Sequence, residues 1–361
     1  MAPLAIDIRK LGRRIAEPLA YEFDASFVKP SVVSLSLTNR CNLRCPTCSY
    51  WKTPSSARDE ELTTAEIVAL MDKLRAWLGP HAMVFAGGEP FLRPDILQLY
   101  RAAAERGIQV LTVTNGSLLP EPRVKELREL ASTATNPVHT ISVSLNHLDR
   151  AKHDETRGVD FSAERIHRCV EQLNYPGRPF QLTLSTILMG FNIDHAGDMV
   201  RWVRERGLDG VTFQILYFES GNAAYEPRWY EQSPFWDNDA DKINRGMDEL
   251  EKLKRDGWPI RNPLDQLRWM RQYLLDPEQP IAIPCRVGVS HFDIDPNGDV
   301  RLCDVMEPVG NVRQSPPDAI WAGAEAARRR KEIHGCGAQC RIKSCNFRRP
   351  LGEVLRERLG A

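Results

Sequence analysis

The feature that most constrains the fold is an alternation of short apolar runs with segments of helical apolar spacing, from about residue 30 to residue 216. Helical spacing between the runs is clear at Ile67, Leu70, Met71, Leu74 and Leu78. Such alternation is typical of repeated strand–helix units that build a parallel sheet. The six strand-like runs are 32–37, 83–86, 109–113, 140–145, 180–188 and 210–216. Six units suit an open partial (β/α)6 barrel better than a closed eightfold one, so we expect an α/β fold of this kind.

The rest of the chain departs from this pattern. We expect an N-terminal extension over 1–30, the barrel over 31–216, a bridging helical segment over 217–280, a small cysteine-rich domain over 281–350 and a tail over 351–361. Aromatic residues crowd the stretch from Tyr225 to Trp236, where they either pack the bridge or line a substrate site. Asn297-Gly298 predicts a hairpin turn in the cysteine-rich part.

Composition and charge narrow the function. The chain has 48 Lys and Arg against 48 Asp and Glu, so its formal net charge is zero and it lacks the basic footprint of a nucleic-acid binder. Its first thirty residues hold neither the apolar run of a signal peptide nor that of a membrane span, which predicts a cytoplasmic protein without a membrane partner. Nine cysteines in such a protein indicate metal ligation or catalysis rather than disulfides.

Three cysteines, Cys41, Cys45 and Cys48, fall within eight residues after the first strand-like run. One loop with this spacing is able to ligate three irons of a four-iron cluster and leaves the fourth iron without a local protein ligand. An open iron binds a substrate or cofactor, whereas four protein ligands close a structural zinc site. Zinc with a distant fourth ligand remains the alternative.

The C-x3-C-x2-C spacing after the first barrel strand resembles the signature of the radical S-adenosylmethionine superfamily. The resemblance implies that the open iron binds the methionine end of S-adenosylmethionine. Reductive cleavage then gives methionine and a 5′-deoxyadenosyl radical that abstracts hydrogen from the substrate. The family usually has an aromatic residue before the third cysteine, but this chain has Thr47 there, and Tyr50 or Trp51 is the candidate to pack on adenine.

A second motif, Gly87-Gly88-Glu89-Pro90, follows the second strand-like run and resembles the family's GGEP motif. The resemblance implies that its backbone and its carboxylate receive the methionine ammonium. Glycine permits close backbone approach, and a carboxylate complements an ammonium group. In isolation the same residues would make an ordinary turn before a helix.

Three further residues are candidates for the cofactor. Ser144 and Arg157 resemble the pair that binds the cofactor's carboxylate in related enzymes, and arginine grips carboxylates with two hydrogen bonds. Where the family commonly has an acidic residue, this chain has Asn146. Asn115, in Thr-Asn-Gly after the third run, is a candidate for the ribose or methionine end, or is a turn residue.

A second cysteine set holds Cys285, Cys303, Cys336, Cys340 and Cys345. The stretch resembles the SPASM extension of radical enzymes, or its shorter twitch form. SPASM proper usually carries more cysteines and two auxiliary clusters, so five cysteines favour one auxiliary [4Fe–4S] cluster held by Cys285, Cys303 and two of the other three. A structural zinc knuckle is the alternative.

The resemblance, which covers roughly residues 30–350, fixes the initiating chemistry better than its outcome. It implies an electron donor of the flavodoxin or ferredoxin type and leaves oxidation, epimerisation, lyase chemistry and carbon–carbon bond formation open. No signal picks out a general base or other catalytic residue. Thirty residues before the first strand are too few for a leader-binding domain, so we expect a small polar substrate such as a sugar, cyclitol, nucleoside or amino-acid derivative. A peptide- or protein-modifying radical enzyme is the second hypothesis, and a non-catalytic zinc protein is the third.

Overall fold

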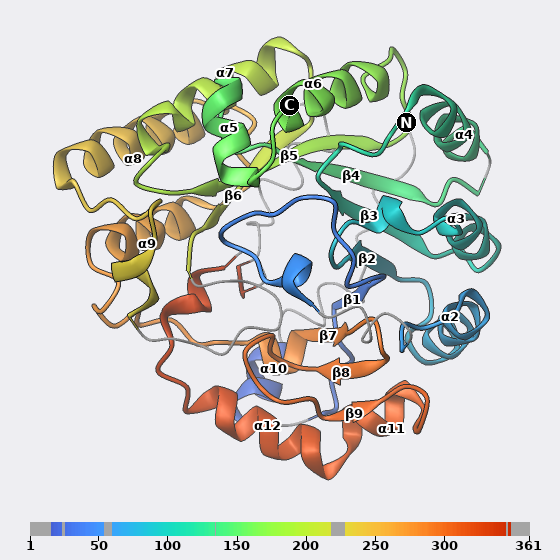
Figure 1. Ribbon diagram of the computed structural model, residues 1–361. Coiled ribbons are helices and arrows are strands. Elements are labelled where there is room, and N and C mark those ends of the chain that lie inside the picture. Colours follow the sequence, from blue (N-terminus) through green and yellow to red (C-terminus); the bar gives the residue numbers. More distant parts are fainter. Residues whose placement is uncertain are drawn as a thin grey trace.

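A single mixed sheet runs through most of the molecule. The computed structural model describes residues 16–23, 26–53, 60–133, 135–217, 228–343 and 346–347. Among them, nine strands form the order β6-β5-β4-β3-β2-β1-β7-β8-β9. Strands β1 to β6 pair in parallel and curve as part of a barrel (Figure 1). Their bounds are β1 Val32–Ser36, β2 Ala82–Ala86, β3 Gln109–Thr114, β4 Val138–Ser144, β5 Gln181–Leu188 and β6 Gly210–Ile215.

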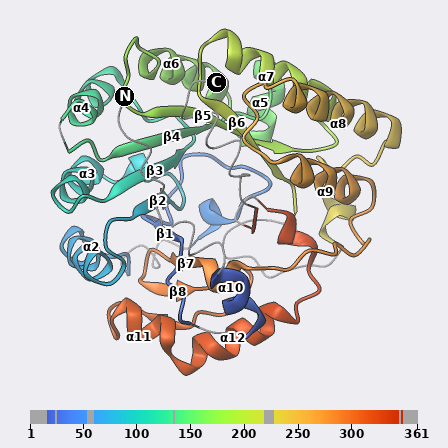
Figure 2. The same cartoon turned by 180° about the vertical axis from the view of Figure 1, so that it is seen from behind.

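Helices cover the outside of this curved sheet, as the view from behind also shows (Figure 2). Each of α2, α3, α4, the pair α5 and α6, and α7 connects two successive parallel strands. The expected partial (β/α)6 barrel is therefore confirmed. Within the described ranges, none of the helices has the length and apolar character needed to cross a bilayer. The bounds are α2 Thr64–Leu78, α3 Ile96–Glu105, α4 Glu121–Ala131, α5 Arg150–Arg157, α6 Ser162–Leu173 and α7 Ala196–Glu205.

The two faces of the sheet differ in accessibility. On β1, Val33 and Leu35 are buried against the helices, whereas Ser34 and Ser36 alternate with them and stay half-exposed. The same alternation recurs on β2, β3 and β6, because successive side chains of a strand point to opposite faces. The inner face of the barrel therefore remains accessible while the outer face is core.

The C-terminal part extends the barrel sheet. Strand β7 (His291–Ile294) pairs in parallel with β1, and β8 (Asp299–Arg301) and β9 (Gly310–Asn311) continue it antiparallel. The predicted Asn297-Gly298 turn joins β7 to β8, with Gly298 at φ +91°. In the described residues of this part, three helices and one 3-10 turn follow: α10 Val287–Ser290, α11 Pro317–Ala322, α12 Ala324–His334 and η6 Gln339–Ile342. A continuous sheet thus joins both cysteine-bearing regions, an arrangement that the sequence pattern did not indicate.

Helices α8 (Ala240–Arg255) and α9 (Leu264–Leu275) occupy the bridge beyond β6. Between them, Ile260 pairs with Val211 at the edge of β6. The described aromatic residues of the bridge pack against one another, with Trp236 in edge contact with Trp229 and with Tyr273 of α9. They fit the packing interpretation, while Tyr225 lies outside the described residues.

Candidate active site

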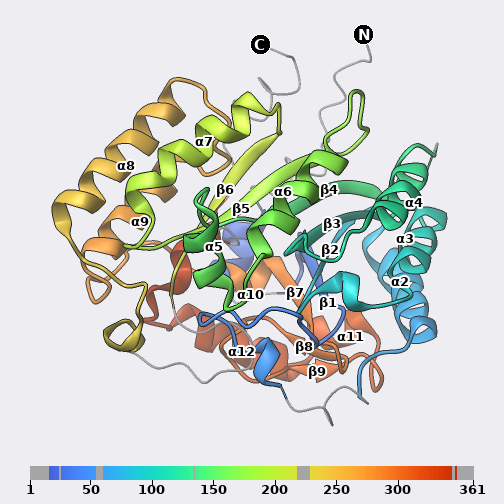
Figure 3. The same cartoon turned by 45° about the horizontal axis from the view of Figure 1, so that its top comes forward.

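The first cysteine loop crosses the end of the barrel between β1 and the 3-10 turn η1 (Tyr50–Lys52) (Figure 3). Cys41, Cys45 and Cys48 are thiols outside any disulfide, and each is partly accessible. Burial raises the pKa of the Cys41 thiol to about 12. A thiol in such surroundings becomes a thiolate readily only beside positive charge, and the irons of a cluster supply that charge.

Two aromatic residues close the loop on its C-terminal side. The Trp51 indole donates a hydrogen bond to the Cys45 carbonyl over 3.0 Å, which ties the aromatic ring to the ligand loop itself. The Tyr50 hydroxyl lies 3.3 Å from the Ser36 hydroxyl on the inner face of β1. Tyr50 therefore reaches into the barrel interior, and Trp51 covers the loop.

The Gly87-Gly88 turn packs directly against the start of the cysteine loop. Gly87 has φ +109°, and a Cβ on Gly88 would lie 2.1 Å from the Arg40 carbonyl oxygen. Gly88 N–H donates to the Thr38 carbonyl and Glu89 N–H to the Arg40 carbonyl, both over 2.8 Å. No side chain fits at Gly88 without opening this contact, which explains the glycine.

Glu89 is fully buried, and its carboxylate accepts three hydrogen bonds from within the protein. Phe91 N–H and the Thr114 hydroxyl donate to Oε1, and Asn115 N–H donates to Oε2. Burial raises the pKa of Glu89, although these donors and the charge of Arg123 oppose the shift. The carboxylate therefore joins the ends of β2 and β3, and one acceptor position of Oε2 has no donor among these three.

Asn115 holds the loop after β3 to the cysteine loop. Its side-chain amide N–H donates to the side-chain oxygen Oδ1 of Asn42 over 3.0 Å, and its own Oδ1 accepts from the backbone N–H and the hydroxyl of Ser117. Asn42 in turn donates to the Ser117 hydroxyl over 2.8 Å. As placed, Asn115 is a turn residue that orders the segment directly after Cys41.

Arg157 ends α5 beside the cysteine loop. Its guanidinium lies 3.9 Å from the Cys45 sulfur, and its carbonyl accepts from Arg44 N–H. Gly158 follows at φ +64°, where a Cβ would lie 2.3 Å from the Arg44 carbonyl oxygen. Ser144 ends β4 with a half-exposed side chain on the inner face, beside Ser185 of β5. The structure thus brings Arg157 to the predicted cluster site and turns Ser144 towards the interior.

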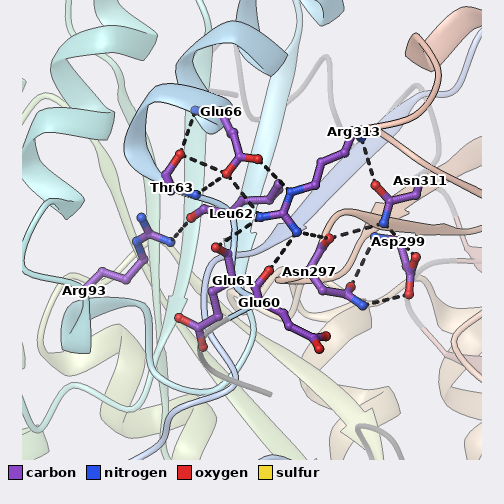
Figure 4. A network of polar contacts seen from close by, with 10 residues as sticks. All are labelled: Glu60, Glu61, Leu62, Thr63, Glu66, Arg93, Asn297, Asp299, Asn311 and Arg313. Atoms are coloured by element: carbon purple, nitrogen blue, oxygen red, sulfur yellow. Dashed lines mark hydrogen bonds and ion pairs between the residues drawn. The ribbon is translucent and has the colours of Figure 1, made fainter. Parts of the chain in front are cut away.

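A short segment, the strap (residues 60–66), connects this site to the C-terminal part. Figure 4 shows the Arg313 guanidinium pointing into the strap, where it contacts Glu66 Oε1 at 2.7 Å and the carbonyls of Glu60 and Asn297 at 2.9 and 3.0 Å. The Arg313 guanidinium hydrogen bond lowers the pKa of Glu66 to about 2. Arg313 follows β9, so it fixes the strap to the turn between β7 and β8.

The strap in turn holds the beginning of the cysteine loop. Glu61 Oε1 accepts from the Thr38 hydroxyl and from Asn39 N–H, each over 2.8 Å. Arg93 donates to the carbonyls of Leu37 and Leu62 over 3.0 and 2.9 Å. Sequence reasoning missed this connection, since no motif marks residues so far apart in the chain.

The second cysteine set converges as well. Burial, with smaller contributions from Cys285 and Cys336, raises the pKa of the Cys340 thiol to about 12. Burial likewise raises the pKa of Cys303, and Cys340 and Cys285 lie near enough to act on it. Four of the five predicted ligands therefore share one neighbourhood, and Cys345 lies outside the described residues.

Three polar side chains beside this set were not predicted. Lys343 donates to the Tyr217 hydroxyl over 2.9 Å and pairs with Asp304, which directly follows Cys303. Burial would raise the pKa of Asp304, but the Lys343 ammonium outweighs it and the pKa is lowered. Tyr217 follows β6, so this group links the end of the barrel to the auxiliary cysteines.

The spacing of the thiols bears on the zinc alternative. Among the described residues, no three His, Cys, Asp or Glu side chains are placed to hold a single metal ion. A zinc ion needs its ligands about 2.0–2.3 Å away from one point, whereas a four-iron cluster spreads its thiolates over several irons. The family model that matches the second cysteine set decides between the two, because it describes an iron–sulfur cluster-binding domain.

Fold and site together define an iron–sulfur protein with a partial barrel, and the family comparisons agree. The radical SAM superfamily model matches residues 35–203, and the iron–sulfur cluster-binding SPASM model matches residues 285–346. The chain belongs to the radical SAM superfamily and carries a C-terminal SPASM domain. It is an enzyme of that class, with [4Fe–4S] clusters and S-adenosylmethionine as cofactors.

Individual proteins extend the comparison. The AdoMet-dependent heme synthase of Methanosarcina barkeri is 26% identical over 331 residues, which cover 89% of each chain. The PqqA peptide cyclase of Streptomyces rochei is 30% identical over 188 residues, or 52% of this chain and 49% of the cyclase. The solved structure of Streptococcus suis SuiB bound to precursor peptide SuiA has a TM-score of 0.62 at 17% identity and covers 90% of this chain and 72% of SuiB. At this level of identity, the likeness to SuiB shows that the two proteins share a fold.

Proposed function

We propose that the enzyme modifies a peptide or protein by radical chemistry, with the substrate lying along the inner face of the barrel sheet. The observation that carries this proposal is the chemistry of that face. Ser185 and Thr212 are neighbours across β5 and β6, and both stay half-exposed. Across β1 and β7, Ser34 lies beside Asp293 in the same way. Hydroxyl and carboxyl groups of this kind bind backbone amides.

The geometry supports a role for each candidate residue in this proposal. Cys41, Cys45 and Cys48 would hold the cluster that, with S-adenosylmethionine bound, supplies the adenosyl radical chemistry of the family. The backbone of Gly87 and Gly88 would face the methionine ammonium, with the charge of Glu89 behind it.

Arg157 and Ser144 would hold the cofactor's carboxylate, because an arginine fork suits that group and Ser144 faces the interior. Asn115 would act indirectly, by ordering the loop through Asn42.

The auxiliary cluster would be held by Cys285, Cys303, Cys336 and Cys340, with Cys345 as the remaining candidate. The Tyr217, Lys343 and Asp304 group stands between this set and the barrel end. It offers a cation and a carboxylate to a polar group of the substrate, which would hold the substrate between the two cofactor sites.

The relatives favour this proposal over the small polar molecule expected from the sequence. A relative named for a peptide substrate matches half of the chain, and the peptide-bound SuiB shares the fold. A tetrapyrrole is the second candidate substrate, because the M. barkeri relative named AdoMet-dependent heme synthase matches almost the whole of both chains.

The deciding experiment uses anaerobically reconstituted enzyme with S-adenosylmethionine and reductant. Peptides encoded beside the gene and iron-bound tetrapyrroles are added in parallel, and 5′-deoxyadenosine and substrate mass are followed. A mass change in a peptide, absent with Cys41→Ala, is the expected result. Turnover of the tetrapyrrole alone would establish the second candidate, and stimulation by small sugars or nucleosides alone would refute both.

A further inference from the structure

A surface cavity of about 680 Å³ lies between α3, α4 and α6, beside the loop that follows β3. Leu118 and Leu119 contribute to its apolar wall, and Arg123, Arg165 and Arg168 supply its positive charge. The cofactor site described above uses none of these side chains. The cavity is therefore a separate feature of the surface.

This cavity backs directly onto the predicted cluster site. Ser117 belongs to its wall, and the Ser117 hydroxyl accepts from Asn42, the residue after Cys41. Arg123 also lies near enough to Glu89 to oppose the rise in the pKa of that carboxyl, which burial causes. A protein bound at the cavity would thus contact Ser117, which is hydrogen-bonded to the residue that follows the predicted cluster ligand Cys41. It would lie away from the inner face proposed for the substrate.

The positive charge of the cavity is only partly compensated. Its lining holds three arginines and one carboxylate, Glu126, which is itself paired with Arg101. Arg165 is exposed and has no ion-pair partner among the described residues, and Arg168 pairs only with Glu164 at the surface. An acidic surface is the complement of this arrangement.

A second hollow, near the first cysteine loop, has a lining of the opposite charge. It lies beside Gly158, whose Cα packs on the Arg44 carbonyl, and has a volume of about 710 Å³. Its charged lining is one arginine and four carboxylates, namely Arg150, Asp154, Glu155, Asp160 and Glu164. An acidic protein would be repelled there, so of these two hollows only the arginine-lined one fits such a partner.

We propose that the arginine-lined cavity and the adjoining face of α6 are the docking site for an acidic electron-carrier protein of the flavodoxin or ferredoxin type. The proposal rests on the proposed cofactor chemistry, in which each cleavage consumes one electron. The carrier is oxidised by one electron and the cluster is reduced by one.

The test compares two protein reductants and one chemical reductant in cofactor cleavage without any substrate. Wild type and the double variant Arg165→Glu/Arg168→Glu are each assayed for 5′-deoxyadenosine with flavodoxin kept reduced by NADPH and its reductase, with a reduced ferredoxin, and with dithionite. The expected result is about a tenfold higher carrier concentration at half-maximal rate, since two exposed charge contacts are lost. The dependence on salt should also weaken, while the dithionite rate stays unchanged.

Arg245→Glu/Lys252→Glu on α8 is the matched control, because it changes the net charge equally on an exposed helix far from the cavity in the fold. It should leave all three rates unaltered. Equal carrier dependence in both double variants would overturn the proposal, as would wild type that responds to dithionite but to neither carrier. Loss of the dithionite rate in the α6 variant would overturn it too, and a changed oligomeric state would assign the surface to a second copy. Wild type inactive with dithionite would instead refute the proposed cofactor chemistry.

Discussion

The contact between the Gly87-Gly88 turn and the cysteine loop gives the sharpest prediction. In Gly88→Ala the new Cβ would start 2.1 Å from the Arg40 carbonyl oxygen, and real Cβ contacts stay beyond 3.0 Å, so the two segments must separate by at least 0.9 Å. Hydrogen bonds of 2.8 Å from Gly88 N–H to Thr38 and from Glu89 N–H to Arg40 do not survive that displacement. Two lost bonds at about 1 kcal/mol each and an overpacking cost of about 1–3 kcal/mol give about 3–5 kcal/mol.

That energy is lost within the cofactor site, so we expect Gly88→Ala to lose iron from the first cluster and to cleave S-adenosylmethionine at least tenfold more slowly. Iron content after anaerobic reconstitution and the rate of 5′-deoxyadenosine formation measure both effects. Gly107→Ala is the control, because Gly107 has φ +60° with no atom within 4 Å of the point where a Cβ would lie, and its cost is about 1 kcal/mol of backbone strain. Iron content and cleavage equal in the two variants would refute the argument.

Three further substitutions test other contacts. Arg313→Ala should cost about 0.5–1 kcal/mol, because Glu66 and Arg313 are both about one-third exposed and solvent screens their pairing. The pKa of Glu66 is about 2 in the folded protein against 4.5 ordinarily, so the stabilisation by this ion pair is complete above pH 4.5 and is lost as the pH falls through 2. Denaturation of wild type and Arg313→Ala at pH 5 and pH 2.5 should therefore show a smaller difference in the free energy of unfolding at the lower pH. Asn262→Ala should lower the free energy of unfolding in urea by about 2–3 kcal/mol, since the backbone N–H and C=O of Phe213 both lose a buried partner. Arg157→Lys should weaken equilibrium binding of S-adenosylmethionine about tenfold at unchanged iron content, since lysine cannot donate two parallel hydrogen bonds to the cofactor's carboxylate.

The parallel strands and the first cluster loop were predictable because their signals are local. Each strand shows as a short apolar run, and Cys41, Cys45 and Cys48 lie within one loop whose spacing alone restricts the metal chemistry. The two glycines of the Gly87-Gly88 turn also indicate that another backbone segment packs closely there, and the backbone of Thr38 and Arg40 does so. Local sequence sufficed wherever the decisive neighbours lie on the same loop or the next one.

The remaining features depend on contacts between distant residues. Lys343 and Tyr217 are separated by 126 positions and Arg313 and Glu66 by 247, and neither pair belongs to a periodic pattern or a spacing rule. The pairing of β7 with β1 is of the same kind, because a four-residue strand carries no sign of which edge it will join. Such contacts form only once the completed sheet has brought these distant segments together.

The long-range contacts also mean that the two cysteine regions are mechanically connected. Arg313 holds the strap, Glu61 of the strap accepts from Thr38 and Asn39, and the Thr38 carbonyl accepts from Gly88. Every link is a direct hydrogen bond or a covalent neighbour, and β7 runs beside β1 throughout. Because the strap reaches the cysteine loop from the auxiliary side, we infer that the SPASM domain supports the first cluster loop structurally, in addition to carrying cysteines of its own.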